Sequence, residues 1–130
     1  MKRAYYDSKP SVLEAVGNGS SLYRWDIREE VVENGEAMNG GDGGVRTQWS
    51  CLEVEIWHPL TANKITEVVI SSVWDSNYEQ KMVNEYNSAV LGVYDEETAD
   101  NKIKVYKDFL NERVRLKVQV DKDCAEFGVK

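Results

Sequence analysis

The chain has 130 residues and a mass of 14.8 kDa, the size of one ordinary domain, and 42% of its residues are hydrophobic, which excludes the disordered class. Its 16 Lys and Arg against 23 Asp and Glu give a net charge of −7, so binding to nucleic acid phosphates is not expected. Two cysteines and one histidine are too few for a disulfide framework or a zinc site built from protein ligands alone, and we expect no cofactor.

The start of the chain predicts no targeting segment. Met1–Lys9 lacks the apolar core of a secretory signal, and the longest apolar runs, such as Val68–Ile70, fall far short of the ~20 residues that cross a bilayer. We therefore expect no membrane partner, a location in the cytoplasm or in an assembled particle, and both thiols, Cys51 and Cys124, in the reduced state.

The first half of the chain carries strand patterns. Val12–Val16 and Leu22–Glu33 flank Asn18 and Gly19, the pair that favours a type I′ hairpin turn. The second strand alternates, which predicts two sets of side chains on opposite faces: Tyr23, Trp25, Ile27 and Val31 on one, and Arg24, Asp26, Arg28 and Glu30 on the other.

A glycine-rich segment, residues 34–46, has no periodicity and is expected to be a flexible connection to a third strand that begins near Thr47. That strand again divides its side chains between two faces: Leu52, Val54 and Ile56 on one, and Trp49, Cys51, Glu53, Glu55 and Trp57 on the other. Because opposite charges stabilise neighbouring strands, Arg24 and Arg28 are predicted to lie across from Glu53 and Glu55.

The second half carries helix signals. Pro59 ends the third strand and Thr61 is a candidate N-cap for a helix with an apolar stripe from Ile65 to Val73. Ser76–Glu79 matches the capping box of a second helix. Gly92 is typical of the left-handed residue that ends a helix. The acidic residues of Asp95–Glu97 suit the first turn of a third helix, which would carry Ile103, Tyr106, Phe109 and Leu110.

Residues 114–120 fit two structures. Valine and leucine alternate with charged or polar residues there, which is the period of a strand. No Gly, Pro or Asn-Gly interrupts the stretch from Glu112 to Phe127, which favours continuation of the third helix. We favour the helix and leave the strand open.

These segments predict the α+β class in a single domain spanning residues 1–130. A β-rich half, residues 1–58, would form an antiparallel sheet of three to four strands. A helical half, residues 59–130, would supply two to three helices packed on one face of that sheet.

Several of these motifs together resemble small uncharacterised proteins encoded among the structural genes of Bacteroidales prophages. The residues that carry the resemblance are Tyr23–Ile27, Trp49–Val54, Ile65–Trp74, Tyr86-Asn87 and Tyr106–Leu110. The resemblance implies a virion or tail-assembly accessory role with a helical C-terminus, and it supplies no catalytic residues. The glycine-rich segment has no counterpart in the pattern.

Three functional interpretations follow. The first is a non-catalytic protein that acts through contacts with a protein partner. That partner would be another phage structural protein or a second copy of the chain. The second is a binding module whose exposed aromatic side chains hold a carbohydrate or peptide, with Tyr23, Trp25, Trp49 and Trp57 as the candidate binding residues. The third is an acid/base hydrolase using Glu53, Glu55 or His58. We favour the first, because no nucleophile, base and oxyanion donor converge in the sequence.

Overall fold

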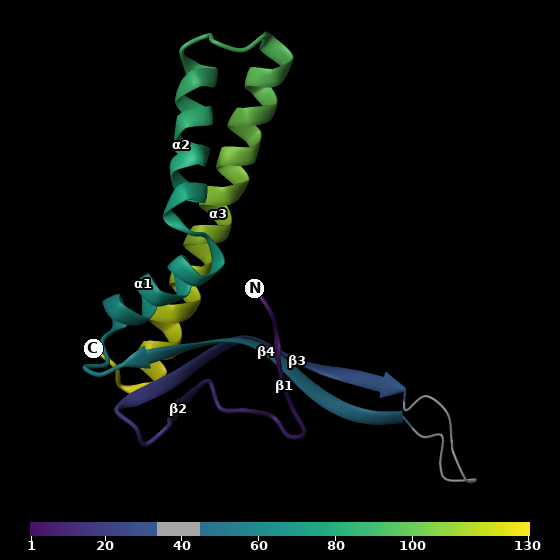
Figure 1. The fold of residues 1–130 in the computed structure, drawn as a ribbon, viewed down its shortest axis with the longest axis vertical. Helices are drawn as coiled ribbons and strands as arrows, with labels where there is room; N and C mark the ends of the chain where they lie inside the picture. Colours follow the sequence, from purple (N-terminus) through teal and green to yellow (C-terminus); the bar gives the residue numbers. More distant parts are fainter. Residues whose placement is uncertain (34–44) are drawn as a thin grey trace. The chain divides into compact units, whose positions relative to one another are not determined.

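A computed structural model describes residues 1–33 and 45–130 and divides the chain into two compact units, Met1–Leu60 and Thr61–Lys130 (Figure 1). The antiparallel sheet lies in the first unit and three helices in the second, so the α+β class is confirmed. Most of the predicted flexible connection, residues 34–44, lies outside the described residues, whereas Val45 and Arg46 already belong to a strand.

The sheet has the strand order β1-β4-β3-β2, and all neighbouring strands are antiparallel. Its two central strands are long and its two outer strands are short. The bounds are Ala4–Tyr6 for β1, Leu13–Ala15 for β2, Ser20–Glu33 for β3 and Val45–Trp57 for β4. The central strands therefore form a ribbon that extends well past both outer strands (Figure 1).

The β2–β3 hairpin is confirmed, but its predicted type I′ turn is wrong. Val16 N donates to Ser20 O at 3.0 Å, so three residues form the loop, and the left-handed φ angles are at Gly17 and Gly19 and not at Asn18. Asn18 acts through its side chain instead. Its Oδ1 accepts hydrogen bonds from the backbone N and the Oγ of Ser20, at 3.1 and 2.6 Å.

A β-bulge divides β3. Trp25 pairs with Leu52, but the next pair along the ladder is Arg28 with Ser50, so β3 holds one extra residue there. Asp26, with φ of 52°, adopts the left-handed conformation at this point. The extra residue exchanges the two faces of β3 beyond it.

The sheet thus has two faces that are named here for one residue each. The Tyr23 face carries Ser21, Tyr23, Trp25, Leu52, Val54 and Ile56 and, beyond the bulge, Arg28, Glu30, Ser50 and Gln48; the Glu53 face carries Arg24, Glu53, Glu55 and Trp57 and, beyond the bulge, Glu29, Val31, Thr47 and Trp49. The predicted pairing of Arg24 with Glu53 is confirmed. The predicted position of Arg28 across from Glu53 and Glu55 is wrong, and so is that of Val31 beside Tyr23, because the bulge lies between them.

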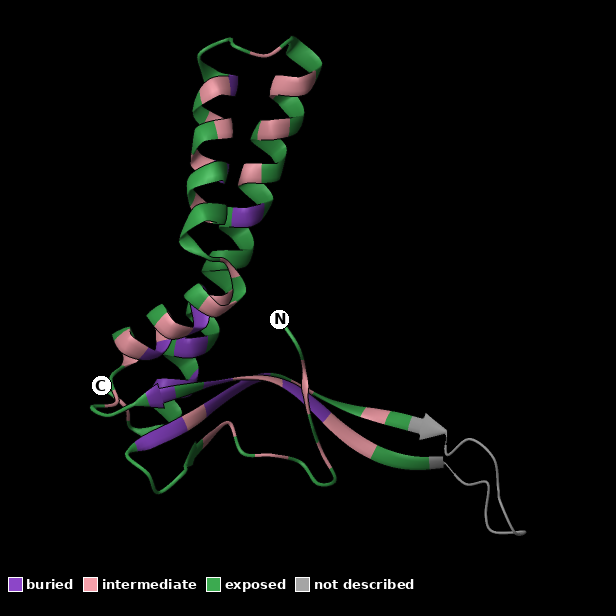
Figure 2. Ribbon diagram, viewed as in Figure 1, coloured by how far each residue is buried: buried purple, intermediate pink, exposed green. Residues whose placement is uncertain are grey.

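Buried residues gather in one half of the ribbon. Tyr23, Cys51 and Ile56 are 1%, 0% and 1% exposed, whereas residues 28–31 and 46–49, the part beyond the bulge whose burial is described, are exposed or half-buried (Figure 2). The described part of the ribbon beyond the bulge, residues 28–31 and 46–50, therefore buries little side-chain surface.

The second unit consists of three helices, α1 (Ala62–Val73), α2 (Ser76–Val90) and α3 (Glu96–Phe127). Each begins at a side-chain cap: Thr61, Asp75 and Asp95 accept hydrogen bonds from Lys64 N, Tyr78 N and Thr98 N. The cap at Thr61 was predicted, while α2 is capped by Asp75 and not by the predicted Ser76. Gly92 is left-handed, as predicted.

Residues 114–120 are helical, so the strand alternative is wrong. In α3 the alternating apolar residues point in different directions around the helix: Val120 is buried, while Val114 and Val118 are exposed. The first half of α3 packs antiparallel to α2, with the rings of Tyr86 and Tyr106 stacked at 4.7 Å. Over the residues that the structure covers, none of the helices combines the length and apolar content needed to cross a membrane.

Candidate functional site

Arg24 links the four strands of the sheet. It is 3% exposed and lies on the Glu53 face, and its guanidinium bonds Glu53 of β4 at 2.9 Å, Glu14 of β2 at 2.7 Å and the Tyr6 hydroxyl of β1 at 3.1 Å. The connection between β1 and β2 crosses the same face, where the carbonyl of Ser11 accepts from Arg24 at 3.1 Å (Figure 1).

The electrostatics of this cluster favour a permanent charge. Burial opposes the charged form of Arg24, but hydrogen bonds to Glu14, Glu53 and Tyr6 outweigh it and raise the pKa of Arg24. Burial and the hydrogen bond that Tyr6 donates to Glu53 raise the pKa of the Tyr6 phenol. Both shifts favour the protonated forms of Arg24 and Tyr6, which fits a structural role for these two side chains.

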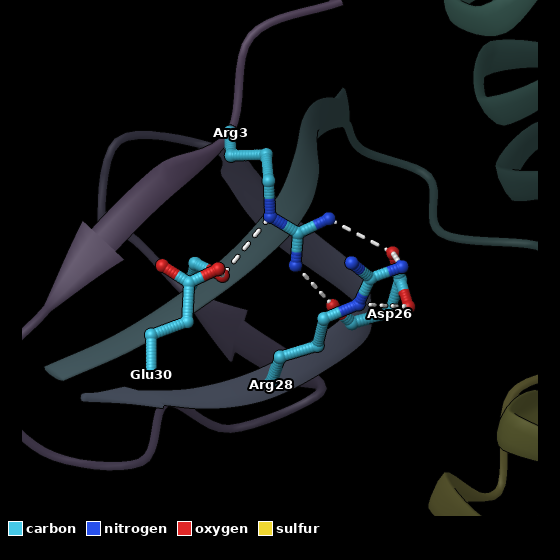
Figure 3. Close-up of polar contacts among 5 residues, drawn as sticks. Arg3, Asp26, Arg28 and Glu30 are labelled. Carbon is cyan, nitrogen blue, oxygen red and sulfur yellow. Dashed lines mark hydrogen bonds and ion pairs between the residues drawn. The ribbon is translucent and has the colours of Figure 1, made fainter. Parts of the chain in front are cut away.

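A second polar cluster lies at the bulge (Figure 3), and its members Arg28, Glu30 and Ser50 lie on the Tyr23 face of the sheet. Arg3, just before β1, donates to the Asp26 carboxylate at 2.8 Å, to the Asp26 carbonyl at 2.6 Å and to Ser50 Oγ at 3.0 Å. Arg28 Nη2 lies 2.9 Å from the same carboxylate, and Ser50 Oγ donates to Glu30 at 2.8 Å. Burial would raise the pKa of Asp26, but the hydrogen bonds from Arg3 and Arg28 hold it below its usual value.

This cluster explains the bulge. A non-glycine residue in the left-handed region costs about 1 kcal/mol or more, and Asp tolerates the region better than most residues. Arg3 binds both the side chain and the carbonyl of Asp26, so it holds the residue in that conformation. The two arginines are satisfied by the carboxylate they share, and the arrangement is a structural lock.

The four aromatic candidates do not converge. Tyr23 and Trp25 are buried on the Tyr23 face and stack on each other at 5.8 Å. Trp49 and Trp57 lie on the Glu53 face, eight residues apart on β4, which is about 26 Å along a strand. Trp49 lies under the ammonium group of Lys9, whereas Trp57 is 52% exposed.

The three acid/base candidates, Glu53, Glu55 and His58, have different surroundings. Glu53 accepts from Arg24 and Tyr6, Glu55 Oε2 lies 3.2 Å from Ser20 Oγ, and His58 is an exposed residue just past the end of β4. Glu53 and Glu55 share a face, but the hydrogen bonds of Glu53 leave it committed to the Arg24 cluster.

An open hollow of about 470 Å³ lies at the edge of β4 in the exposed half of the ribbon. Its lining residues come from the end of β1 and the start of β4: Tyr5, Tyr6, Asp7, Arg46 and Gln48. Arg46 is exposed and forms no ion pair with any described residue. Sequence reasoning missed this hollow, and the only signal for it was a charged residue at the start of a strand.

The described residues include no group of three or more His, Cys, Asp or Glu side chains placed to hold a metal ion. Comparisons of the chain with protein-family models, with curated proteins and with solved structures gave no match.

Proposed function

We propose that this protein is a non-catalytic assembly protein that acts by binding other proteins, and that it serves a phage particle as a virion or tail-assembly accessory protein. The resemblance of its sequence motifs to prophage structural-region proteins supports the phage setting. One structural observation supports the mode of action: a ribbon of 14 and 13 residues is flanked by outer strands of only three residues each.

Among the described strands, the two outer ones are too short to pair along the full length of the ribbon. β1 pairs with Trp49–Cys51 of β4, and β2 pairs with Ser21–Tyr23 of β3, with one further backbone hydrogen bond at each end of β2, from Arg24 N to Val12 O and from Val16 N to Ser20 O. Along the exposed half of the ribbon, no strand among the described residues lies outside β3 or β4. Open backbone donors and acceptors at a sheet edge are a template for pairing with another chain.

The other two interpretations have less geometric support. A ring-based binding site needs two aromatic side chains at one concave surface, and the candidate rings are buried or far apart on the sheet. A hydrolase needs carboxylates that converge on a substrate, and Glu53 is engaged by a buried arginine. Protein binding through sheet edges requires neither.

Native electrophoresis of extracts from the producing cells, read with an antibody to this chain, tests the proposal. We expect the chain in a band well above its own 14.8 kDa, with itself or with another protein. Light scattering of the purified chain over a range of concentrations then separates self-association from a second partner. A chain that migrates alone in the extract and stays monomeric at high concentration would refute the proposal.

A further inference from the structure

The edge of β4 opens where β1 leaves it. β1 ends at Tyr6, opposite Trp49, and the next residues of β4 toward its start, Arg46–Gln48, pair with β3 on one side only. On the other side of Arg46–Gln48 no described strand lies. No strand of residues 1–33 or 45–130 therefore occupies the position that a longer β1 would take along this stretch.

The backbone at this edge points outward at Thr47. His58 N donates to Gly19 O of the β3 side, and backbone groups alternate in direction along a strand, so the even-numbered residues of β4 point to β3. The bulge lies in β3, so this alternation runs unbroken along β4. The N–H and C=O of Thr47 consequently face the open edge.

The hollow supplies room and charge at the same place. Tyr5, Arg46 and Gln48 share the Tyr23 face at this end of the sheet and line the hollow together with Tyr6 and Asp7, so the lining holds one carboxylate besides the Arg46 guanidinium. The Tyr5 ring is 56% exposed, and the guanidinium of Arg46 has no acidic partner among the residues described. In a strand paired with this edge, the residue opposite Arg46 would carry its side chain on the same face as Arg46. A carboxylate would be favoured at that position.

We propose that this edge binds an extended terminal segment of a partner protein as an added strand, with an acidic side chain of that segment facing Arg46. The proposal rests on the proposed function and names the surface it uses. A second copy fits less well, because its own β4, laid antiparallel here, would meet β1 beyond Gln48 after only three residues. A chain terminus can begin or end at Gln48 without meeting β1.

Fluorescence anisotropy with two labelled eight-residue peptides, one alternating Glu with Val and one alternating Lys with Val, tests the edge directly. We expect the Glu peptide to bind the full chain at least about tenfold more tightly than the Lys peptide at low salt. Arg46→Glu should reverse this preference. Lys104→Glu, the same charge change at an exposed position of α3, should leave it unchanged. Equal binding of both peptides, or no binding, would overturn the proposal.

A backbone test separates strand addition from charge attraction alone. Thr47→Pro removes the outward N–H without removing a β3–β4 hydrogen bond, and Thr47→Ala keeps it. Thr47→Pro should lose at least about tenfold in affinity for the Glu peptide, while Thr47→Ala should bind as the wild type does. Circular dichroism checks that both variants fold. Equal binding by both variants would refute strand addition.

The two proposals can fail separately. A chain that stays in its high-mass assembly when it carries Thr47→Pro binds its partner elsewhere, so the edge proposal falls and the assembly function stands. A chain that never enters an assembly refutes the function, whatever the peptides show.

Discussion

Arg24 Nε lies 2.9 Å from Glu53 Oε2 across directly paired positions of β3 and β4, and the same guanidinium reaches β1 and β2. One buried cation thus holds side chains of all four strands of the sheet. Its partners are oxygen atoms that would lose their donor together if it were removed.

Arg24→Met should lower the free energy of unfolding of the first unit by about 3 kcal/mol, because the Glu53 carboxylate would be left without its cation. Urea unfolding followed by tryptophan fluorescence measures the loss. Arg28→Met is the matched control, since Arg28 is 61% exposed and its pair with Asp26 is worth about 0.5 kcal/mol. Similar losses in both variants would contradict the role given to Arg24.

Asp26→Asn should make the dependence of stability on pH shallower in the acid range. The native pKa of Asp26 lies below its unfolded value, so its ion pairs stabilise the fold above about pH 4 and lose this effect as the pH falls through the native pKa. Near neutral pH the free energy of unfolding of the wild type should exceed that of the variant by under about 1 kcal/mol, because the ion pair is partly exposed. A gap between the two that does not shrink in acid would rule this out.

The two thiols should report on the two units separately. Burial raises the pKa of both Cys51 and Cys124, with nearby carboxylates adding to it, and both side chains are buried in the described structure. We expect slow reaction with Ellman's reagent at neutral pH and fast reaction in urea. Labelling Cys124→Ala and Cys51→Ala across a urea series gives the unfolding of each unit in turn. Fast labelling of either native thiol would contradict its burial.

Phe109→Ala should destabilise the helical unit by about 3 kcal/mol. The Phe109 ring is buried, with its edge contacts to Trp74 and Tyr78 at 5.2 and 5.8 Å between centroids. The adjacent Leu110 is 40% exposed, so Leu110→Ala should cost about 1 kcal/mol. Thermal unfolding by circular dichroism compares the two, and the same midpoint in both would refute the assigned packing.

Alternation in the sequence was sufficient for the long strands and for the pairing of Arg24 with Glu53, because that part of β3 is regular. It failed beyond Trp25, since the residues continue to alternate in type while the backbone inserts an extra residue. The cause is Arg3, a residue distant in sequence that binds Asp26, and no local pattern carries that information.

The candidate site shows the same division. Tyr23 and Trp25 were predicted correctly to share a face, and both are buried there. The hollow beside Arg46 requires β1 to pair with Trp49–Cys51 of β4, a contact between residues more than forty positions apart. In the helical unit, local signals sufficed for the cap at Thr61, whereas Asp75 and Ser76 compete one position apart for the start of α2.

The bulge at Asp26 has an implication for length variation in homologues and engineered forms. Between the bulge and the distal ends of β3 and β4, adding or deleting residues two at a time in both strands keeps each remaining side chain on its present face of the sheet. A change of one residue in β3 alone would move the valine and glutamate side chains beyond it from one face of the sheet to the other. Tolerated indels should therefore come in even numbers there, which a deletion library can count.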